Sequence, residues 1–228
     1  METTMYDNLL LLPLFQGLSK NDFTTILEKV RFHFLTYQEG EIFIRQGEDC
    51  QQLCFLLNGK AIARTTDKEH GFTFSESFET PTIIEPQSLF GMQPQYSATY
   101  QAQTQVKVLT IEKRYIFSEL NKHEIFQLNF LNLLTNRIQT AYQKIWHTHI
   151  GNLNEKLVHF IATRCQFPEG EKTLQITMED WAALIDETRI NLSRLLNELQ
   201  DKGLVQLKRK EIFIPDFEKL TNHLNEHD

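Results

Sequence analysis

Residues 176–214 constrain the fold more than any other part of the chain. Their sequence, ITMEDWAALIDETRINLSRLLNELQDKGLVQLKRKEIFI, predicts a short helix, a tight turn, a second helix and a hairpin. Thr177 has the composition of a helix N-cap, because the acidic Asp180 follows it three residues later. Thr188 can cap the second helix, which we expect to run to about Lys202.

The second helix has two faces of opposite character. Leucines recur at i, i+3, i+4 and i+7 and form an inward stripe of Leu192, Leu195, Leu196 and Leu199. The other side is polar and basic and holds Arg189, Ile190, Asn191, Ser193, Arg194 and Asn197. A DNA major groove admits one α-helix and offers base acceptors to arginine and base edges to asparagine. We therefore expect Arg189 and Arg194 to contact guanine and Ile190 to contact a thymine methyl group.

A basic hairpin follows this helix. Gly203 stands where a helix C′ residue is expected, and the tip of the hairpin carries Lys208, Arg209 and Lys210. A basic tip beside a recognition helix suits phosphate contacts, to which Thr177, Thr188 and Ser193 can add hydroxyl donors. The competing interpretation is an ordinary helical hairpin with a solvated charged loop.

Charge separates this segment from the rest of the chain. The 228 residues carry a net charge of −7, whereas residues 187–210 hold six basic and three acidic residues. The overall charge argues against a protein that coats nucleic acid non-specifically, and the local basic patch favours oriented binding to double-stranded DNA.

The N-terminal part has a different sequence pattern, one typical of β-strands. Short apolar runs separated by glycine and polar turns predict strands near residues 30–35, 41–45, 53–57, 60–64, 71–75, 82–84 and 106–111. Helices are expected at residues 18–28 and 123–149, and a loop at residues 167–173. Strands at this spacing suggest an antiparallel β-roll or jelly roll, so the predicted fold class is α+β.

The long helix has a surplus apolar seam. Leu131, Leu134, Ile138, Tyr142 and Ile145 are spaced 3, 4, 4 and 3 residues apart, as in a coiled coil. A seam of this length is most simply buried against a second copy, which predicts a homodimer.

The run ITMEDWAALIDETRINLSRLLNELQDKGLV resembles the C-terminal winged helix-turn-helix of the Crp/Fnr superfamily of transcription regulators. The resemblance implies base contacts from an Arg, a Glu and a second Arg, which fall here on Arg189, Ile190 and Arg194. Ile190 replaces the Glu, so the target site should depart from the family's common half-site. Asp186 stands at the usual small turn residue and tolerates a left-handed backbone.

The N-terminal part resembles the same superfamily. EGEIFIRQGE and FLLNGK look like the paired glycine turns of a cyclic-nucleotide-binding β-roll, and PQSLFGMQPQYSAT like its phosphate-binding cassette. That resemblance implies a Glu for the ribose and an Arg for the phosphate, but the matching positions are Met92 and Tyr96, followed by Ser97 and Ala98. We therefore expect no tight binding of cyclic AMP or cyclic GMP.

Two readings of the cassette remain open: a site for a hydrophobic effector such as haem, or a space filled by the protein's own side chains. His147 or His149 could serve a haem as its single axial ligand. The candidate effector pocket comprises Phe90, Gly91, Met92, Tyr96, Ser97, Ala98, Tyr142, Ile145 and Trp146.

Other classes of function find less support. Cys50, Cys54 and Cys165 form no disulfide framework or iron–sulfur ligand set, which favours a reducing cytoplasm. A metal-dependent jelly-roll enzyme would need clustered histidines, and the roll offers His33 and His70. NLLLLPLF is neither a secretion signal nor a membrane span. A ligand-binding signalling subunit without DNA binding is the remaining alternative.

The sequence thus predicts a non-enzymatic regulator of three parts: a sensor at 1–120, a dimerisation helix and hinge at 121–150, and a DNA-binding domain at 151–228. Double-stranded DNA, a second copy of the chain and, from the resemblance, RNA polymerase are its expected partners.

Overall fold

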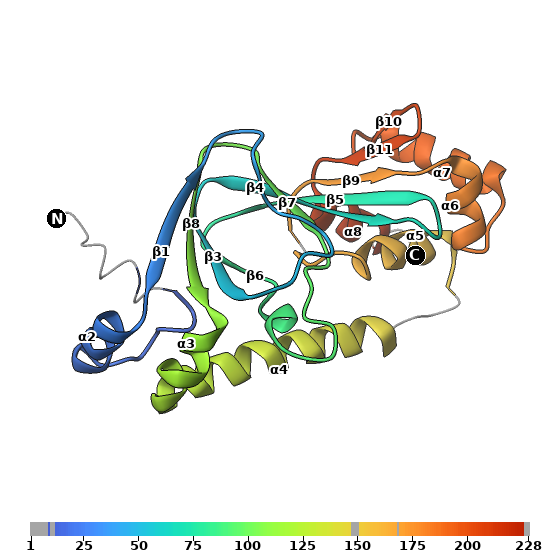
Figure 1. Ribbon diagram of the computed structural model, residues 1–228. Coiled ribbons are helices and arrows are strands. Elements are labelled where there is room, and N and C mark those ends of the chain that lie inside the picture. Colours follow the sequence, from blue (N-terminus) through green and yellow to red (C-terminus); the bar gives the residue numbers. More distant parts are fainter. Residues whose placement is uncertain (1–8, 10–11, 147–150, 168, 226–228) are drawn as a thin grey trace.

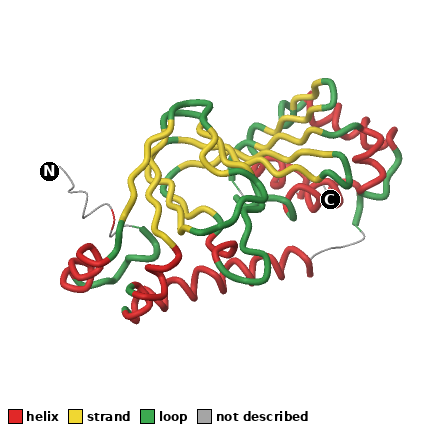
Figure 2. Tube along the Cα trace, viewed as in Figure 1, coloured by secondary structure: helices red, strands yellow, loops and turns green. Residues whose placement is uncertain are grey.

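The computed structural model describes residues 9, 12–146, 151–167 and 169–225, with side chains on the long helix described as far as Gln143. It confirms the predicted α+β class: an N-terminal β-roll, a long helix and a C-terminal part with a helix-turn-helix (Figure 1). Figure 2 shows the strands gathered in the middle of the molecule, with helices along one side and at both ends.

The N-terminal part contains the roll and the helices that flank it. In chain order its elements are α2 (Lys20–Lys29), β1 (Phe32–Tyr37), β2 (Ile42–Ile44), β3 (Gln52–Asn58), β4 (Lys60–Asp67), β5 (Phe72–Glu79), β6 (Thr82–Ile84), η1 (Pro86–Leu89), β7 (Thr99–Ala102), β8 (Val106–Glu112), α3 (Lys113–Ser118) and η2 (Leu120–Lys122). The long helix α4 (Glu124–Trp146) follows and runs along the bottom of the roll in Figure 1.

The C-terminal part contains the helix pair and the hairpin described above, together with one more strand and two more helices. Its elements are α5 (Leu153–Ala162), β9 (Lys172–Gln175), α6 (Met178–Leu184), α7 (Arg189–Asp201), β10 (Gln206–Lys208), β11 (Glu211–Ile214) and α8 (Phe217–Asn225). Strand β9 begins inside the expected loop at residues 167–173. The expected loop was therefore wrong for residues 172 and 173, which belong to the strand. Lys172 is buried, and a lysine at an interior position does not give the alternation of apolar and polar residues that marks a strand.

Two antiparallel sheets organise the molecule. One has the order β1-β8-β3-β6, and the other has the order β10-β11-β9-β5-β4-β7-β2. The second sheet is continuous between the two parts of the chain, because β5 pairs with β9 from Thr73 opposite Gln175 to Glu76 opposite Lys172. The hairpin β10–β11 therefore extends a sheet that begins in the roll.

The apolar interior mostly follows the same division. A large cluster fills the roll and includes Phe15, Phe55 and Phe126, while a second cluster lies under the C-terminal helices around Trp181. Phe72 and Phe74 of β5 belong to the second cluster. The start of β5 is thus part of the core of the C-terminal half.

Candidate nucleic-acid interface and effector cassette

The first helix of the pair, α6, is anchored by the cap that the sequence predicts. Thr177 Oγ1 accepts from the Asp180 amide at 3.1 Å and donates to Asp180 Oδ2 at 2.6 Å. Trp181 is fully buried, with its ring 5.7 Å from that of Phe160 on α5. The helix is therefore fixed to the body of the C-terminal half.

The turn between α6 and α7 is held by a lysine from α5. Asp186 adopts the left-handed conformation expected for it, with φ 51°. Lys156 on α5 donates to the Asp186 carbonyl at 2.9 Å and lies 3.0 Å from Glu187 Oε1. The Lys156 ammonium group therefore holds both Asp186 and Glu187 in place and helps to fix the start of α7.

The second helix presents the two faces that the sequence predicts. Thr188 Oγ1 accepts from the Asn191 amide at 3.2 Å, which confirms the N-cap. Leu192, Leu196 and Leu199 are buried and Leu195 is half-buried. On the outward face, Ser193 is half-buried. The other outward residues are exposed, namely Arg189, Ile190, Asn191, Arg194 and Asn197. Ile190 is 71% exposed, a high value for an aliphatic side chain on a folded surface.

Some of these side chains already have partners on the protein. Arg189 Nε lies 3.0 Å from Glu179 Oε1, and both side chains are more than 60% exposed. Asn197 donates to the Ser193 carbonyl at 2.7 Å. An exposed ion pair contributes little to stability. Breaking the pair between Arg189 and Glu179 to bind a DNA phosphate or base would therefore cost little free energy. Sequence reasoning missed Glu179, which reaches Arg189 only through the angle between α6 and α7.

The hairpin after α7 carries exposed basic residues. Lys208, Arg209 and Lys210 are all exposed, and Lys210 turns the chain with φ 59°. Lys208 Nζ lies 3.1 Å from Glu211 Oε1. The hairpin lies at the same end of the molecule as α6 and α7 (Figure 1). Positive charge therefore borders the exposed face of α7.

The effector cassette lies between β6 and β7. Tyr96 is buried, and its hydroxyl donates to the Gln52 carbonyl at 3.3 Å. Burial, together with the neighbouring Cys50, raises the pKa of Tyr96 well above the usual value. Met92 is fully exposed. The two positions that the resemblance assigns to ribose and phosphate thus carry neither an acid nor a cation.

The other predicted pocket residues differ in exposure and contacts. Phe90 packs against Phe117 and Phe130 at ring distances of 5.0 and 6.2 Å, and Tyr142 is exposed. Gly91 and Ser97 are exposed and Ala98 is buried. The side chains of Ile145 and Trp146, and the candidate haem ligands His147 and His149, lie outside the described residues.

Helix α4 also forms hydrogen bonds at the cassette through Arg137. Arg137 donates to Gln87 Oε1 at 2.7 Å and to the Ile83 carbonyl at 3.1 Å. Burial lowers the pKa of Arg137, and the nearby Tyr100 and Glu85 oppose that shift. The helix and the cassette are therefore coupled by hydrogen bonds from a half-buried guanidinium.

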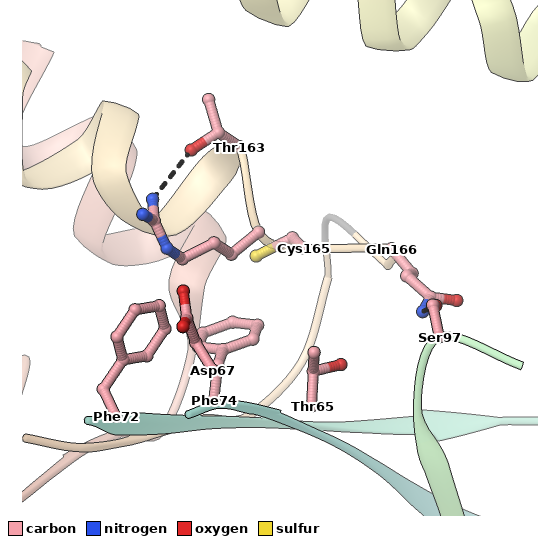
Figure 3. A pocket seen from close by; sticks show the side chains of 9 residues that line it. Thr65, Asp67, Phe72, Phe74, Ser97, Thr163, Cys165 and Gln166 are labelled. Carbon is pink, nitrogen blue, oxygen red and sulfur yellow. Dashed lines mark hydrogen bonds between the residues drawn. The ribbon is translucent and has the colours of Figure 1, made fainter. Parts of the chain in front are cut away.

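A cleft of about 500 Å³ lies between the β4–β5 hairpin and the end of α5. Figure 3 shows Phe72 and Phe74 on its floor and Gln166 beside Ser97 at one side. The Arg164 guanidinium stacks on the Phe160 ring at 3.6 Å and lies 5.2 Å from the ring of Phe72.

Among the described residues no group of three or more His, Cys, Asp or Glu side chains could hold a metal ion. Every described helix is too short or too polar to cross a bilayer.

These features define a DNA-binding regulator built on a sensor roll. Family models match both halves: the cyclic nucleotide-binding domain over residues 34–123 and the Crp-like helix-turn-helix domain over residues 155–222. The chain belongs to the Crp/Fnr family of transcription regulators, which are DNA-binding proteins and not enzymes. No curated protein sequence matches it significantly.

Solved structures share the fold at low sequence identity. The catabolite activator protein of Thermus thermophilus is 20% identical with a TM-score of 0.53, over 93% of this chain and 99% of that one. The c-di-GMP-responsive regulator CLP of Xanthomonas campestris is 14% identical with a TM-score of 0.51, over 86% and 99%. The N-terminal domain of a transcriptional regulator from Streptomyces coelicolor A3(2) is 21% identical with a TM-score of 0.50, over 64% and 100%.

Proposed function

We propose that this regulator binds a palindromic operator as a homodimer and does so without a cyclic nucleotide. The observation that carries the proposal is the exposed face of α7, which combines Arg189, Ile190 and Arg194 on a helix held from behind by buried leucines. Each copy would place this face in one major groove, with half-sites about one helical turn, ~34 Å, apart. The basic hairpin would contact phosphate.

The dimer is supported by the surface of α4. Leu131, Ile138 and Tyr142 are each more than 60% exposed, and Leu128 adds a further exposed leucine. Leu134 is half-buried, and the side chain of Ile145 lies outside the described residues. Covering a row of large apolar side chains with a second copy removes their surface from water, which is favourable. We assign residues 121–150 to this interface and hinge, between a sensor at 1–120 and a DNA-binding domain at 151–228.

Independence from cyclic AMP is supported by the chemistry of the cassette. Tyr96 and Met92 stand where binders of cyclic nucleotides carry Arg and Glu, and the buried Glu85 carboxylate faces the Ser97 and Ala98 amides. A phosphate approaching those amides would meet a like charge, which costs about 4 kcal/mol at 4 Å in surroundings of intermediate polarity. We expect cyclic AMP at 1 mM to leave the midpoint of thermal unfolding unchanged. A saturable rise would contradict this part of the proposal.

The base-reading role is tested with Arg194→Ala on an operator selected from random DNA. The variant should lose about 1–3 kcal/mol of preference for the operator over scrambled DNA, because a bidentate contact to guanine is removed. Fluorescence anisotropy at fixed salt measures both affinities. Lys202→Ala is the matched control, since it removes the same charge from an exposed position just after the same helix. Full retention of preference by Arg194→Ala would remove the residue from the interface.

A further inference from the structure

Glu85 is the least expected acid in the fold. It joins β6 to η1, it is 1% exposed, and its backbone is left-handed with φ 37° and ψ 54°. A glutamate gains nothing from this conformation by itself, and non-glycine residues held there are kept by their surroundings. Burying a carboxylate is also costly unless donors surround it. Both costs point to contacts that require this side chain.

Four hydrogen bonds converge on the carboxylate. Oε2 accepts from Ser88 Oγ at 2.8 Å and from the Ser97 amide at 2.7 Å. Oε1 accepts from the Ala98 amide at 3.1 Å and from the Tyr100 hydroxyl at 2.9 Å. An ionised carboxylate offers about four acceptor positions, so this set of donors matches its capacity. The group is therefore bound as a ligand would be.

The donors form an oxyanion site. Two consecutive backbone amides donate to the same carboxylate, one to each oxygen, and successive amides of this kind bind anions in many proteins. Two hydroxyl groups complete the site, and the half-buried Arg137 guanidinium, which lies close enough for its charge to interact with Glu85, supplies positive charge from α4. Burial, and next the negative charge of Glu85, raise the pKa of Tyr100, so its hydroxyl stays protonated and donates.

We propose that Glu85 is a built-in ligand: its carboxylate occupies an oxyanion site formed by Ser88, Ser97, Ala98 and Tyr100. Shortening the side chain opens that site to a small free carboxylate such as acetate. This proposal rests in part on the proposed independence from cyclic nucleotides, since it identifies Glu85 as the group that takes the place of an external anion. Occupation of the site by Glu85 can be tested without DNA.

The bound carboxylate also reaches the DNA-binding half. Tyr100 Oη lies 3.0 Å from Gln166 Oε1, and Gln166 Nε2 lies 3.3 Å from Ser97 Oγ. The tyrosine has one proton, which it gives to the carboxylate. The Gln166 amide then satisfies both neighbours when its NH₂ group faces Tyr100 and its oxygen accepts from Ser97 (Figure 3 shows Gln166 beside Ser97). The site thus connects the cassette to the segment after α5.

The test is chemical rescue of Glu85→Gly. Glycine accepts the left-handed backbone and leaves room for a carboxylate, so the loss measured is that of the bound group. We expect the midpoint of thermal unfolding to fall by about 10 °C. Sodium acetate should restore part of that loss in a saturable way, while sodium chloride at equal ionic strength does not. The wild type and the control Glu39→Gly, in which an exposed glutamate is replaced, should show no acetate-specific shift.

Glu85→Gln covers the case in which the glycine variant does not fold. Its amide fills the site but turns its NH₂ group toward the donors on one side, so at least one of the Ser97 and Ala98 amides should exchange hydrogen faster than in the wild type, and acetate should not slow that exchange. Two results would overturn the inference: equal responses of Glu85→Gly to acetate and chloride, or unchanged exchange at Ser97 and Ala98 in Glu85→Gln. Loss of operator binding with normal acetate rescue would contradict only the proposed function.

Discussion

Glu187 and Lys156 fix the turn that aims the recognition helix. The hydrogen bond from Lys156 lowers the pKa of the Glu187 carboxyl below its usual 4.5. A group with a lowered folded-state pKa stabilises the protein above about pH 4.5, and that contribution disappears as the pH falls through the folded value. The turn should therefore loosen in acid before the leucine core behind α7 does.

Glu187→Gln tests this residue. We expect the variant to be less stable than the wild type at pH 7 and the difference to shrink as the pH falls below 4.5, where the wild-type carboxyl becomes protonated. Urea unfolding midpoints from pH 3 to 7 measure the effect, and Glu218→Gln on the exposed surface of α8 serves as the control. A difference that stays constant over the whole range would show that the charge of Glu187 plays no part.

Individual residues differ in how well sequence foretells them. The caps Thr177 and Thr188 follow from local chemistry, the left-handed Asp186 follows from the family resemblance, and the structure confirms all three. Glu85 could not be foreseen, because the backbone donors that explain it come from Ser97 and Ala98, twelve and thirteen residues away. The pairing of Arg189 with Glu179 likewise depends on the angle between two helices.

At the scale of elements, α4 shows most directly what a sequence pattern predicts. The seam with spacings of 3 and 4 residues becomes a row of exposed apolar side chains at Leu131, Ile138 and Tyr142. Strands β7 and β9 were missed for one shared reason. Their interior positions include Ala102 and Lys172, which do not give the alternation of large apolar and polar residues that marks a strand.

Ile138→Glu tests whether this row is an interface. Because Ile138 is 67% exposed, the substitution should leave the fold of each subunit intact while placing a charge where the second copy packs. We expect the variant to sediment as a monomer at concentrations at which the wild type is a dimer. Gln139→Glu adds the same charge at the next, exposed position and should stay dimeric. Two variants that sediment alike would place the interface elsewhere.

At the scale of the whole molecule, strand β5 joins the sensor to the DNA-binding half. Its first residues, Phe72 and Phe74, pack in the C-terminal core, and farther along it Glu76 accepts from the Gln166 and Phe167 amides at 2.8 and 2.9 Å. Glu76 also lies 3.9 Å from Lys172 Nζ, and both side chains are almost fully buried. A change in the sensor roll can thus reach α7 through one strand.

Glu76→Ala tests this connection. The variant leaves Lys172 buried without its counter-charge and two amides without an acceptor, which should cost about 3–5 kcal/mol. Calorimetry should show the single unfolding transition of the wild type broaden or split, because the two halves lose part of their shared stability. Glu79→Ala, at the exposed end of the same strand, is the control. A transition as narrow as that of Glu79→Ala would mean that the halves are coupled by other contacts.

Ligand-independent binding to a palindromic operator is tested by selecting bound fragments from random DNA with the purified, ligand-free protein. We expect a palindromic motif with half-sites about one helical turn apart, recovered equally with and without cyclic AMP. Arg194→Ala should weaken the preference at the guanine that this residue contacts, while Lys202→Ala should return the wild-type motif. Recovery of unrelated fragments with no shared motif, or of a motif only when cyclic AMP is added, would exclude this mode of binding.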